Sequence, residues 1–321
     1  MEYLEFSPAG AMASLVRCYW SLSNGDNDSS AMHGSADAAS ADPALPDGSP
    51  ELIFNLGDPF DYVAPDGVVT RQPQAFLVGQ ITRPMVVRPT GRIDLVAVRL
   101  ESHGASILYD HLNRLTDRWI DVGEMPNDHL QLLAAKLGSA TSIVEKLSQV
   151  RDCLECIVAE GPAPDPRVAA AVRAIRESYG TVALDTVAHD LALAPRTLQR
   201  LFAAQVGISP KLLARIVRFQ RVFTAWRTDA RSLARVAAEC GYFDQSHLVR
   251  DFRDFAGAPR LVFLRHCRSS RGSSSRRWSG LRVGRARSPP ISVLRNSPCP
   301  LGLVGSEREI DARHEIGRAH V

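Results

Sequence analysis

Two short stretches of the chain hold side chains that can form hydrogen bonds with the edges of nucleic-acid bases. In residues 195–203 these side chains are Arg196, Thr197, Gln199 and Arg200. In residues 244–252 they are Gln245, Ser246, His247 and Arg250. In the major groove, Arg pairs with guanine and Gln with adenine through two hydrogen bonds each, and Ser or Thr bonds to either base. Both sets are therefore candidate base readers.

Each set needs a helix that turns it outward. Apolar residues recur at helical spacing in both stretches: Leu198, Leu201 and Phe202 in the first, Leu248 and Phe252 in the second. Such a stripe packs into a core, which leaves the polar side chains on the opposite face. Arg200 and Arg250 occupy equivalent places, so the alternative for both is a fixed salt bridge inside the unit.

The two stretches belong to an internal repeat with a shift of 49 to 50 residues. The matched pairs are Leu184 and Leu233, Val187 and Val236, Ala188 and Ala237, Leu198 and Leu248, Arg200 and Arg250, Phe202 and Phe252, Gly207 and Gly257, and Pro210 and Pro259. The shift grows by one residue inside the turn, and the helical patterns on both sides of it are preserved, as one inserted residue in the turn of the second copy would produce. The repeat predicts two helix-turn-helix units, and we call the second helix of each the reading helix.

A helix over residues 210–226 is expected to join the two units, with Ser209 as its N-cap and Pro210 in its first turn. At about 1.5 Å per residue this helix spans about 25 Å. The reading helices would then lie about one turn of B-DNA apart, ~34 Å. Three basic residues of the joining helix either contact phosphates or only solvate the helix: Lys211, Arg215 and Arg218.

The charge is divided along the chain. Residues 1–160 hold 11 Lys and Arg against 22 Asp and Glu, whereas residues 161–264 hold 15 against 9. A basic C-terminal half favours a polyanionic partner, and an acidic N-terminal half repels one. Duplex DNA is therefore the partner expected for the C-terminal half.

The first hundred residues are rich in short apolar runs, at residues 51–56, 75–78, 85–88 and 93–100, separated by Pro and Gly turns. These runs predict strands of a small barrel or sandwich. Residues 24–50 lack an apolar period and are expected to form a mobile loop. From residue 127 to residue 159 the spacing becomes helical, and the Pro-rich residues 161–166 are expected to be a linker.

The six cysteines are scattered, and no signal-peptide or membrane-spanning pattern is present, so a reduced cytoplasm is the expected location. Cys153 and Cys156 have CxxC spacing, but no second pair accompanies them, so a packed helix is favoured over a zinc or thiol-exchange site.

The histidines of the N-terminal half are dispersed, and none lies in a predicted strand. No catalytic residue, metal or cofactor is expected.

The C-terminal motifs resemble those of AraC/XylS-family transcription regulators over residues 166–264. Residues 196–202 with 206–210 are similar to the family's first-unit signature, and residues 241–252 with 255–259 to its second. The resemblance implies a monomeric two-unit reader of adjacent major grooves that regulates nearby promoters. It also implies contact between the second unit and RNA polymerase.

The N-terminal part resembles an uncharacterised sensor domain of some such regulators. The similar segments are residues 6–8, 16–20, 45–48, 51–57 and 76–80. The resemblance implies a cupin-like barrel and names no ligand. A small-molecule effector and a homodimer through this domain are further expectations. We therefore expect an α+β chain with a sensor domain (1–160), a linker (161–166), a DNA-binding domain (167–264) and a tail (265–321).

Two other classes of protein compete with this interpretation. One is a small-molecule-binding barrel enzyme with a DNA-binding appendage, and the other is a DNA-repair methyltransferase fusion. Repair requires an activated nucleophilic cysteine, and Cys18 has Arg17 beside it but no histidine partner. The motifs favour the regulator.

The tail has two interpretations. It is either a basic disordered arm that binds DNA nonspecifically, or the product of a reading frame that shifts near Arg265. The second is favoured, because residues 315–321 resemble a translated sequencing adaptor.

The basic repeat leads to a first prediction. Affinity for duplex DNA should fall steeply with salt, because each phosphate contact by a Lys or Arg releases condensed counterions. The logarithm of the binding constant against the logarithm of salt concentration should have a slope of about −0.9 per contact, which a fluorescence titration measures. A flat response to salt would exclude a DNA reader.

Overall fold

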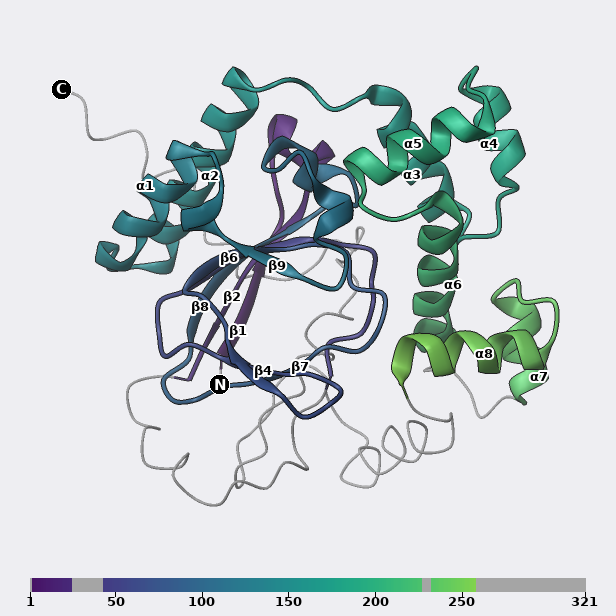
Figure 1. Ribbon diagram of the computed structural model, residues 1–321, viewed down its shortest axis with the longest axis horizontal. Helices are drawn as coiled ribbons and strands as arrows, with labels where there is room; N and C mark the ends of the chain where they lie inside the picture. The colour runs from purple at the N-terminus through teal and green to yellow at the C-terminus, as the bar shows by residue number, and fades with distance from the viewer. Residues whose placement is uncertain (1, 25–42, 227–231, 258–321) are drawn as a thin grey trace, which may run out of the picture.

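The computed structural model describes residues 2–24, 43–226 and 232–257. The tail and most of the expected loop at 24–50 lie outside these residues, as does the final part of the second repeat, including Pro259. The described chain has a β-rich N-terminal part and a helical C-terminal part (Figure 1), which confirms the predicted α+β class.

The N-terminal part contains two antiparallel sheets. The larger has six strands, in the order β1 (Glu2–Phe6), β2 (Val16–Ser23), β8 (Asp94–Leu100), β3 (Glu51–Asn55), β6 (Ala75–Val78) and β9 (Trp119–Asp121). The smaller has three, in the order β5 (Val69–Arg71), β4 (Asp61–Val63) and β7 (Val86–Arg88). The four predicted apolar runs supply β3, β6, β7 and β8, so the predicted strands are present within one or two residues of their expected bounds.

The two faces of the larger sheet carry separate cores, because successive side chains of a strand point to opposite faces. Leu52 and Phe54 of β3 join one apolar cluster with residues of helices α1 (Asp128–Lys136) and α2 (Ile143–Glu160). Ile53 belongs to the cluster on the opposite face, which includes Tyr62 and Val87 of the smaller sheet. Helices thus cover one face and the smaller sheet covers the other.

Short 3-10 helices complete this part of the chain. They are η1 (Gly10–Ser14), η2 (Gly104–Ile107), η3 (Leu112–Arg114), η4 (Val122–Glu124) and η5 (Leu137–Ser139). The helical spacing over residues 127–159 is realised as two helices, because η5 interrupts it and the Ser142 hydroxyl then caps α2 by accepting the N–H of Glu145. None of the described helices is long and apolar enough to cross a membrane.

The C-terminal part contains six helices in its described residues: α3 (Pro166–Glu177), α4 (Leu184–Asp190), α5 (Pro195–Gln205), α6 (Pro210–Trp226), α7 (Leu233–Glu239) and α8 (Gln245–Ala256). In Figure 1, α6 stands between the group α3, α4 and α5 at one end and the pair α7 and α8 at the other. One continuous apolar cluster contains residues of all six helices. Asp165 caps α3 and Pro166 occupies its first turn, as the helix-start preferences require.

The segment 43–50 packs against the helical part of the chain, although the sequence analysis expected a mobile loop there. Leu45 is buried in the cluster of the helical part, and the carbonyl of Pro46 accepts a hydrogen bond from Gln220 of α6. Gly48 has φ +76°, and a Cβ placed on it would lie 2.9 Å from Leu213 Cδ1 of α6. The expectation was wrong for this segment because its few apolar residues pack against a distant helix, which periodicity along the chain cannot show.

Arg176 of α3 joins the helical part to this segment. Its Nη2 donates to the Gly48 carbonyl at 2.8 Å and to Ser102 Oγ at 2.8 Å, and its Nε lies 3.4 Å from a Glu101 carboxylate oxygen. Burial, and next the neighbouring charge of Arg17, lower the pKa of Arg176 to about 10. The guanidinium therefore stays charged near neutral pH and holds three elements together.

A second ion-pair group fixes α8 on α6. Arg215 Nη2 lies 2.7 Å from Asp251 Oδ1 and 2.6 Å from Asp254 Oδ2. Asp251 is fully buried, whereas Arg215 and Asp254 reach solvent. The guanidinium also lies 5.0 Å from the centroid of the Phe255 ring. A buried carboxylate needs such a partner, because an unpaired buried charge is costly.

The Arg215 group leads to a second prediction. Arg215→Met should lower the free energy of unfolding by on the order of 3 kcal/mol, because Asp251 would stay buried without its cation. This value is at the lower end of the range for breaking a buried ion pair. Arg200→Met is the matched control, because Arg200 is exposed and exposed substitutions change stability by about 0.5 kcal/mol at most. Urea denaturation measures both, and equal stabilities would contradict a structural role for Arg215.

Candidate nucleic-acid interface

The two helix pairs α4–α5 and α7–α8 have the same turn. Ala192 and Gly241 take the left-handed conformation at equivalent places, with φ +52° and +78°. The next residue of each turn donates its N–H back to the first helix at 2.9 Å, from Leu193 to Ala188 and from Tyr242 to Ala237. The helix-turn-helix repeat predicted from the sequence is therefore present, with a shift of 49 residues up to this point.

The extra residue of the second copy is Phe243. In the first copy the N-cap of α5, Ala194, directly follows Leu193. In the second copy Phe243 stands between Tyr242 and the N-cap of α8, Asp244. From the N-cap onward the shift is 50 residues, so the change in the shift is located at one position.

The first reading helix, α5, turns its apolar stripe inward as expected. Leu198 and Phe202 are buried and Leu201 is half-buried. The predicted base readers Arg196, Gln199 and Arg200 are exposed on the other face, and Thr197 is half-buried at its edge.

The second reading helix, α8, has the same arrangement. Leu248 and Phe252 are buried, while the predicted readers Gln245, Ser246 and Arg250 are exposed. His247 is half-buried, and its ring meets the Tyr242 ring edge-on at a centroid distance of 5.3 Å. A surface hollow collects the outward side chains of this helix: Gln245, Ser246, Val249, Arg250 and Arg253.

Applying the 50-residue shift to the exposed face of α5 identifies two residues that the sequence analysis missed. Arg196, Gln199, Arg200 and Ala203 correspond in α8 to Ser246, Val249, Arg250 and Arg253. The place of Gln199 is therefore taken by the apolar Val249, and Arg253 adds a cation one turn beyond Arg250. The internal repeat already contained this correspondence, but the register between the two reading helices is clear only when their N-caps, Ala194 and Asp244, are aligned.

Neither Arg200 nor Arg250 has an ion-pair partner among the described residues, so the structure gives no support to the salt-bridge alternative for them. The basic residues of α6 differ from one another. Lys211 is exposed, whereas Arg215 is held by its two carboxylates and Arg218 donates to the Gly180 carbonyl at 2.9 Å and lies over the Tyr242 ring. Lys211 is therefore a better candidate for a phosphate contact than Arg215 or Arg218.

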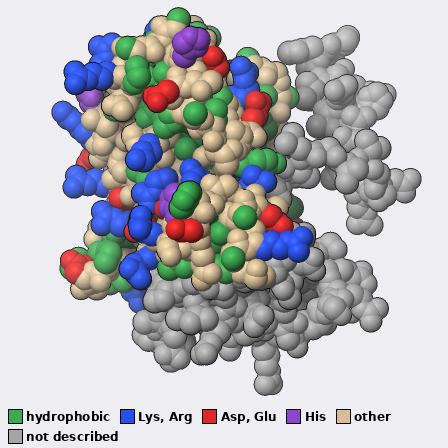
Figure 2. Space-filling model, turned by 90° about the vertical axis from the view of Figure 1, so that its right-hand side faces the viewer, with side chains coloured by type: hydrophobic (Ala, Val, Ile, Leu, Met, Phe, Trp, Pro, Cys, Tyr) green, Lys and Arg blue, Asp and Glu red, His purple; other side chains and the backbone are tan. Residues whose placement is uncertain are grey.

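The surface of the helical part is basic along one side. Figure 2 shows Lys and Arg side chains distributed along the left-hand side of this face, with fewer Asp and Glu among them. A surface on which positive side chains outnumber negative ones attracts the phosphate backbone of DNA.

Other chemistry finds little support in the described residues. Burial raises the pKa of the Cys153 thiol to about 11, so it is protonated near neutral pH, and the neighbouring Cys156 is exposed on the same helix, α2. A reactive thiol requires the opposite shift. Within the described ranges no three His, Cys, Asp or Glu side chains form a group that could hold a metal ion.

Comparison with solved structures gives distant likenesses. ToxT from Vibrio cholerae O395 is 9% identical with a TM-score of 0.38, and the match covers 70% of this chain and 92% of that one. ToxT from Vibrio cholerae strain SCE256, bound to an unsaturated fatty acid, is 10% identical with the same TM-score, covering 70% and 89%. The AraC-like transcriptional activator CuxR is 17% identical with a TM-score of 0.22, covering 73% and 78%. No curated relative matches the sequence.

Family models give the more specific result. Residues 187–266 match a helix-turn-helix domain, and residues 4–121 match a domain of unknown function (DUF6597). The first match covers both reading helices, and the second covers both sheets except the first two residues of β1. Residues 187–266 therefore form a helix-turn-helix domain, in agreement with the AraC-type motifs of the sequence, and this domain follows an N-terminal domain of unknown function.

Proposed function

We propose that the protein reads a specific DNA sequence through two adjacent segments of the major groove, one for each reading helix. The observation that carries this proposal is the repeated outward face of α5 and α8, where polar and basic side chains stand free of ion pairs with the described residues. α6 has 17 residues and separates the two units by about 25 Å along its axis. This separation is compatible with two reading helices on one side of a duplex.

The residues of this interface have different proposed roles. Arg196, Gln199, Gln245 and Arg250 read base edges, and Thr197, Arg200, Ser246 and His247 assist them at the margins. Lys211 contacts phosphates. Phosphate contacts fix the position of the protein on the duplex, and base contacts determine the sequence that it prefers.

The third prediction separates base reading from attraction to phosphates. Gln199→Ala should weaken binding to the preferred site by about 1–3 kcal/mol and scarcely alter binding to random duplex, because only a base contact discriminates. Gln245→Ala should do the same in the other half-site, about one helical turn away.

Competition binding against a panel of single-base variants measures both effects. The two substitutions should add within a few tenths of a kcal/mol, since separated sites act independently. Lys211→Ala is the control and should weaken specific and random binding alike. Equal losses on specific and random DNA from both Gln substitutions would mean that these residues only position the protein.

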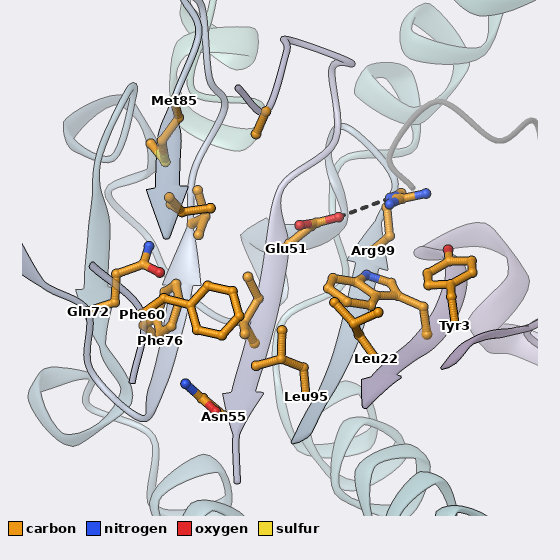
Figure 3. Close-up of a pocket in the computed structure, with 15 residues that line it drawn as sticks. Tyr3, Leu22, Glu51, Asn55, Phe60, Gln72, Phe76, Met85, Leu95 and Arg99 are labelled. Atoms are coloured by element: carbon orange, nitrogen blue, oxygen red, sulfur yellow. Dashed lines mark hydrogen bonds and ion pairs between the residues drawn. The ribbon is translucent and has the colours of Figure 1, made fainter. Parts of the chain in front are cut away.

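We further propose that a small-molecule effector binds in the N-terminal domain and acts on the helical part. A cavity of about 50 Å³ lies between the two sheets (Figure 3), with apolar walls that include Trp20, Phe60 and Phe76. The Trp20 Nε1 is buried there without a hydrogen-bond partner in the described part of the chain. A mostly apolar ligand with one hydrogen-bond acceptor would complement these walls.

The segment 43–50 offers the route from the cavity to DNA. Ala44 lines the cavity and forms backbone hydrogen bonds with Met85, while the next residue, Leu45, belongs to the apolar cluster of the helical part. Near the C-terminal end of the segment, Arg99 of the cavity wall pairs with two carboxylates. Its Nε lies 3.9 Å from Asp47 Oδ2 and 3.0 Å from Glu51 Oε1. A ligand that moves these groups would also move the contacts with α3 and α6.

The fourth prediction tests this coupling, which must act in both directions. Binding of duplex DNA should change the hydrogen-exchange rates of the Ala44 and Ser49 amides at least several-fold, since Ala44 donates its N–H to the Met85 carbonyl and Ser49 donates its N–H to Asp47 Oδ1. Arg176→Ala should abolish the change, because it removes the contacts of α3 with Gly48 and Ser102.

The control is Arg167→Ala on the same helix, whose partner Asp165 lies two residues away. Exchange rates that DNA leaves unaltered in the unmodified protein would contradict control by an N-terminal effector. Contact with RNA polymerase, dimerisation through the N-terminal domain and the division at residues 161–166 stay predictions.

A further inference from the structure

Phe243 is the most unusual side chain of the second helix-turn-helix unit. It is 94% exposed, whereas the next most exposed large apolar side chain among the described residues, Val144, is 69% exposed. Removing a Phe side chain from water stabilises a folded chain. The fold gains almost none of this stabilisation from Phe243, because its side chain stays in solvent. Core packing therefore does not account for a Phe at this position.

The local structure offers Phe243 an inward position that it does not take. A residue just before a helix N-cap often packs on the fourth residue of that helix, which here is Leu248. Leu248 is fully buried without it, and the preceding Tyr242 is turned inward in its place. Because Phe243 is the one residue that the second turn has and the first lacks, it is an addition to a turn that closes without it.

Its place in the chain puts Phe243 beside the DNA-reading surface. It precedes Asp244, the N-cap of α8, and the first two residues of α8, Gln245 and Ser246, line the surface hollow with Arg250. A reading helix presents its N-terminal residues to the base edges. A phenyl ring forms no hydrogen bond with phosphate, but it packs against the 5-methyl group of thymine, which projects into the major groove.

We infer that Phe243 is a specificity-determining residue that packs against thymine methyl groups at one edge of the half-site read by α8. This inference rests on the proposed function, since it requires α8 to lie in the major groove. The first half-site has no equivalent contact, because the corresponding turn lacks this residue. Thymine preference at this edge should therefore be confined to one half of the recognition sequence.

The test removes only the methyl group. The full-length protein first selects its preferred duplex from a random pool, and each dT of both half-sites is then replaced in turn by dU. At one or two positions at the edge of the α8 half-site, dU should weaken binding about fourfold, the value of one buried methyl-sized group. Phe243→Ala should weaken binding to the dT duplex by at least as much and should show no further loss with dU.

Such non-additivity identifies a direct contact. Phe243→Leu should restore part of the preference for dT, and the exposed Leu132→Ala on α1 is the control that should leave every affinity unchanged. Thermal melting checks that the variants fold equally well.

Three outcomes would overturn the inference, and they are distinguishable. If the protein selects a sequence but Phe243→Ala responds to every dU as the unmodified protein does, Phe243 contacts no thymine while the proposed function stands. If the Phe243→Ala variant binds DNA as the unmodified protein does but no longer activates transcription by purified RNA polymerase, the ring belongs to a protein interface. If no sequence is selected, the proposed function fails as well.

Discussion

The apolar surface of α6 is the feature on which the other parts of the structure depend. Its Phe219 is fully buried and meets the rings of Phe252 and Phe255 of α8 at centroid distances of 5.1 and 5.3 Å. Nearer the start of α6 the chain passes so closely that a Cβ on Gly180 would lie 2.1 Å from the Ala214 carbonyl oxygen. Close packing along its length makes α6 a rigid spacer, and the proposed reading of two segments of the major groove needs a fixed separation between the reading helices.

Buried charge then fixes the orientation of the second unit on this spacer. Arg215 is connected to two carboxylates on one face of α8, so rotation of α8 about its axis would break both ion pairs. The outward face of α8 is thereby set by an inward interaction. Arginine thus has two uses in this domain. Arg215 of α6 stabilises the fold by pairing with carboxylates of α8, whereas the arginines exposed on the reading helices are available to DNA.

The N-terminal domain reaches this helical body in two places. One is the contact of α5 and the loop after it with η2 and η3, where the Thr116 hydroxyl donates to the Gly207 carbonyl, and the other is the short segment 43–50. Leu45 enters the helical core, Gln220 and Arg176 hold the backbone on either side of it, and Arg99 holds Asp47 and Glu51 from within the β-rich part. One segment therefore belongs to two cores. Because packed cores resist small deformations and switch between discrete arrangements, such a segment is suited to carry a signal between them.

The sequence by itself determined the helix-turn-helix repeat, the inward stripes of both reading helices and four of the nine strands described in the N-terminal part. These features depend on spacings of two to four residues along the chain, and on a comparison of the chain with itself. Only the tertiary structure decided that Arg215 and Arg218 have internal partners, that the segment 43–50 is packed, and that Phe243 is left in solvent beside a buried Tyr242. Arg215 and Asp251 are 36 residues apart, and Arg176 and Gly48 are 128 apart. Such pairs meet only because of the path that the whole chain takes, which no local period encodes.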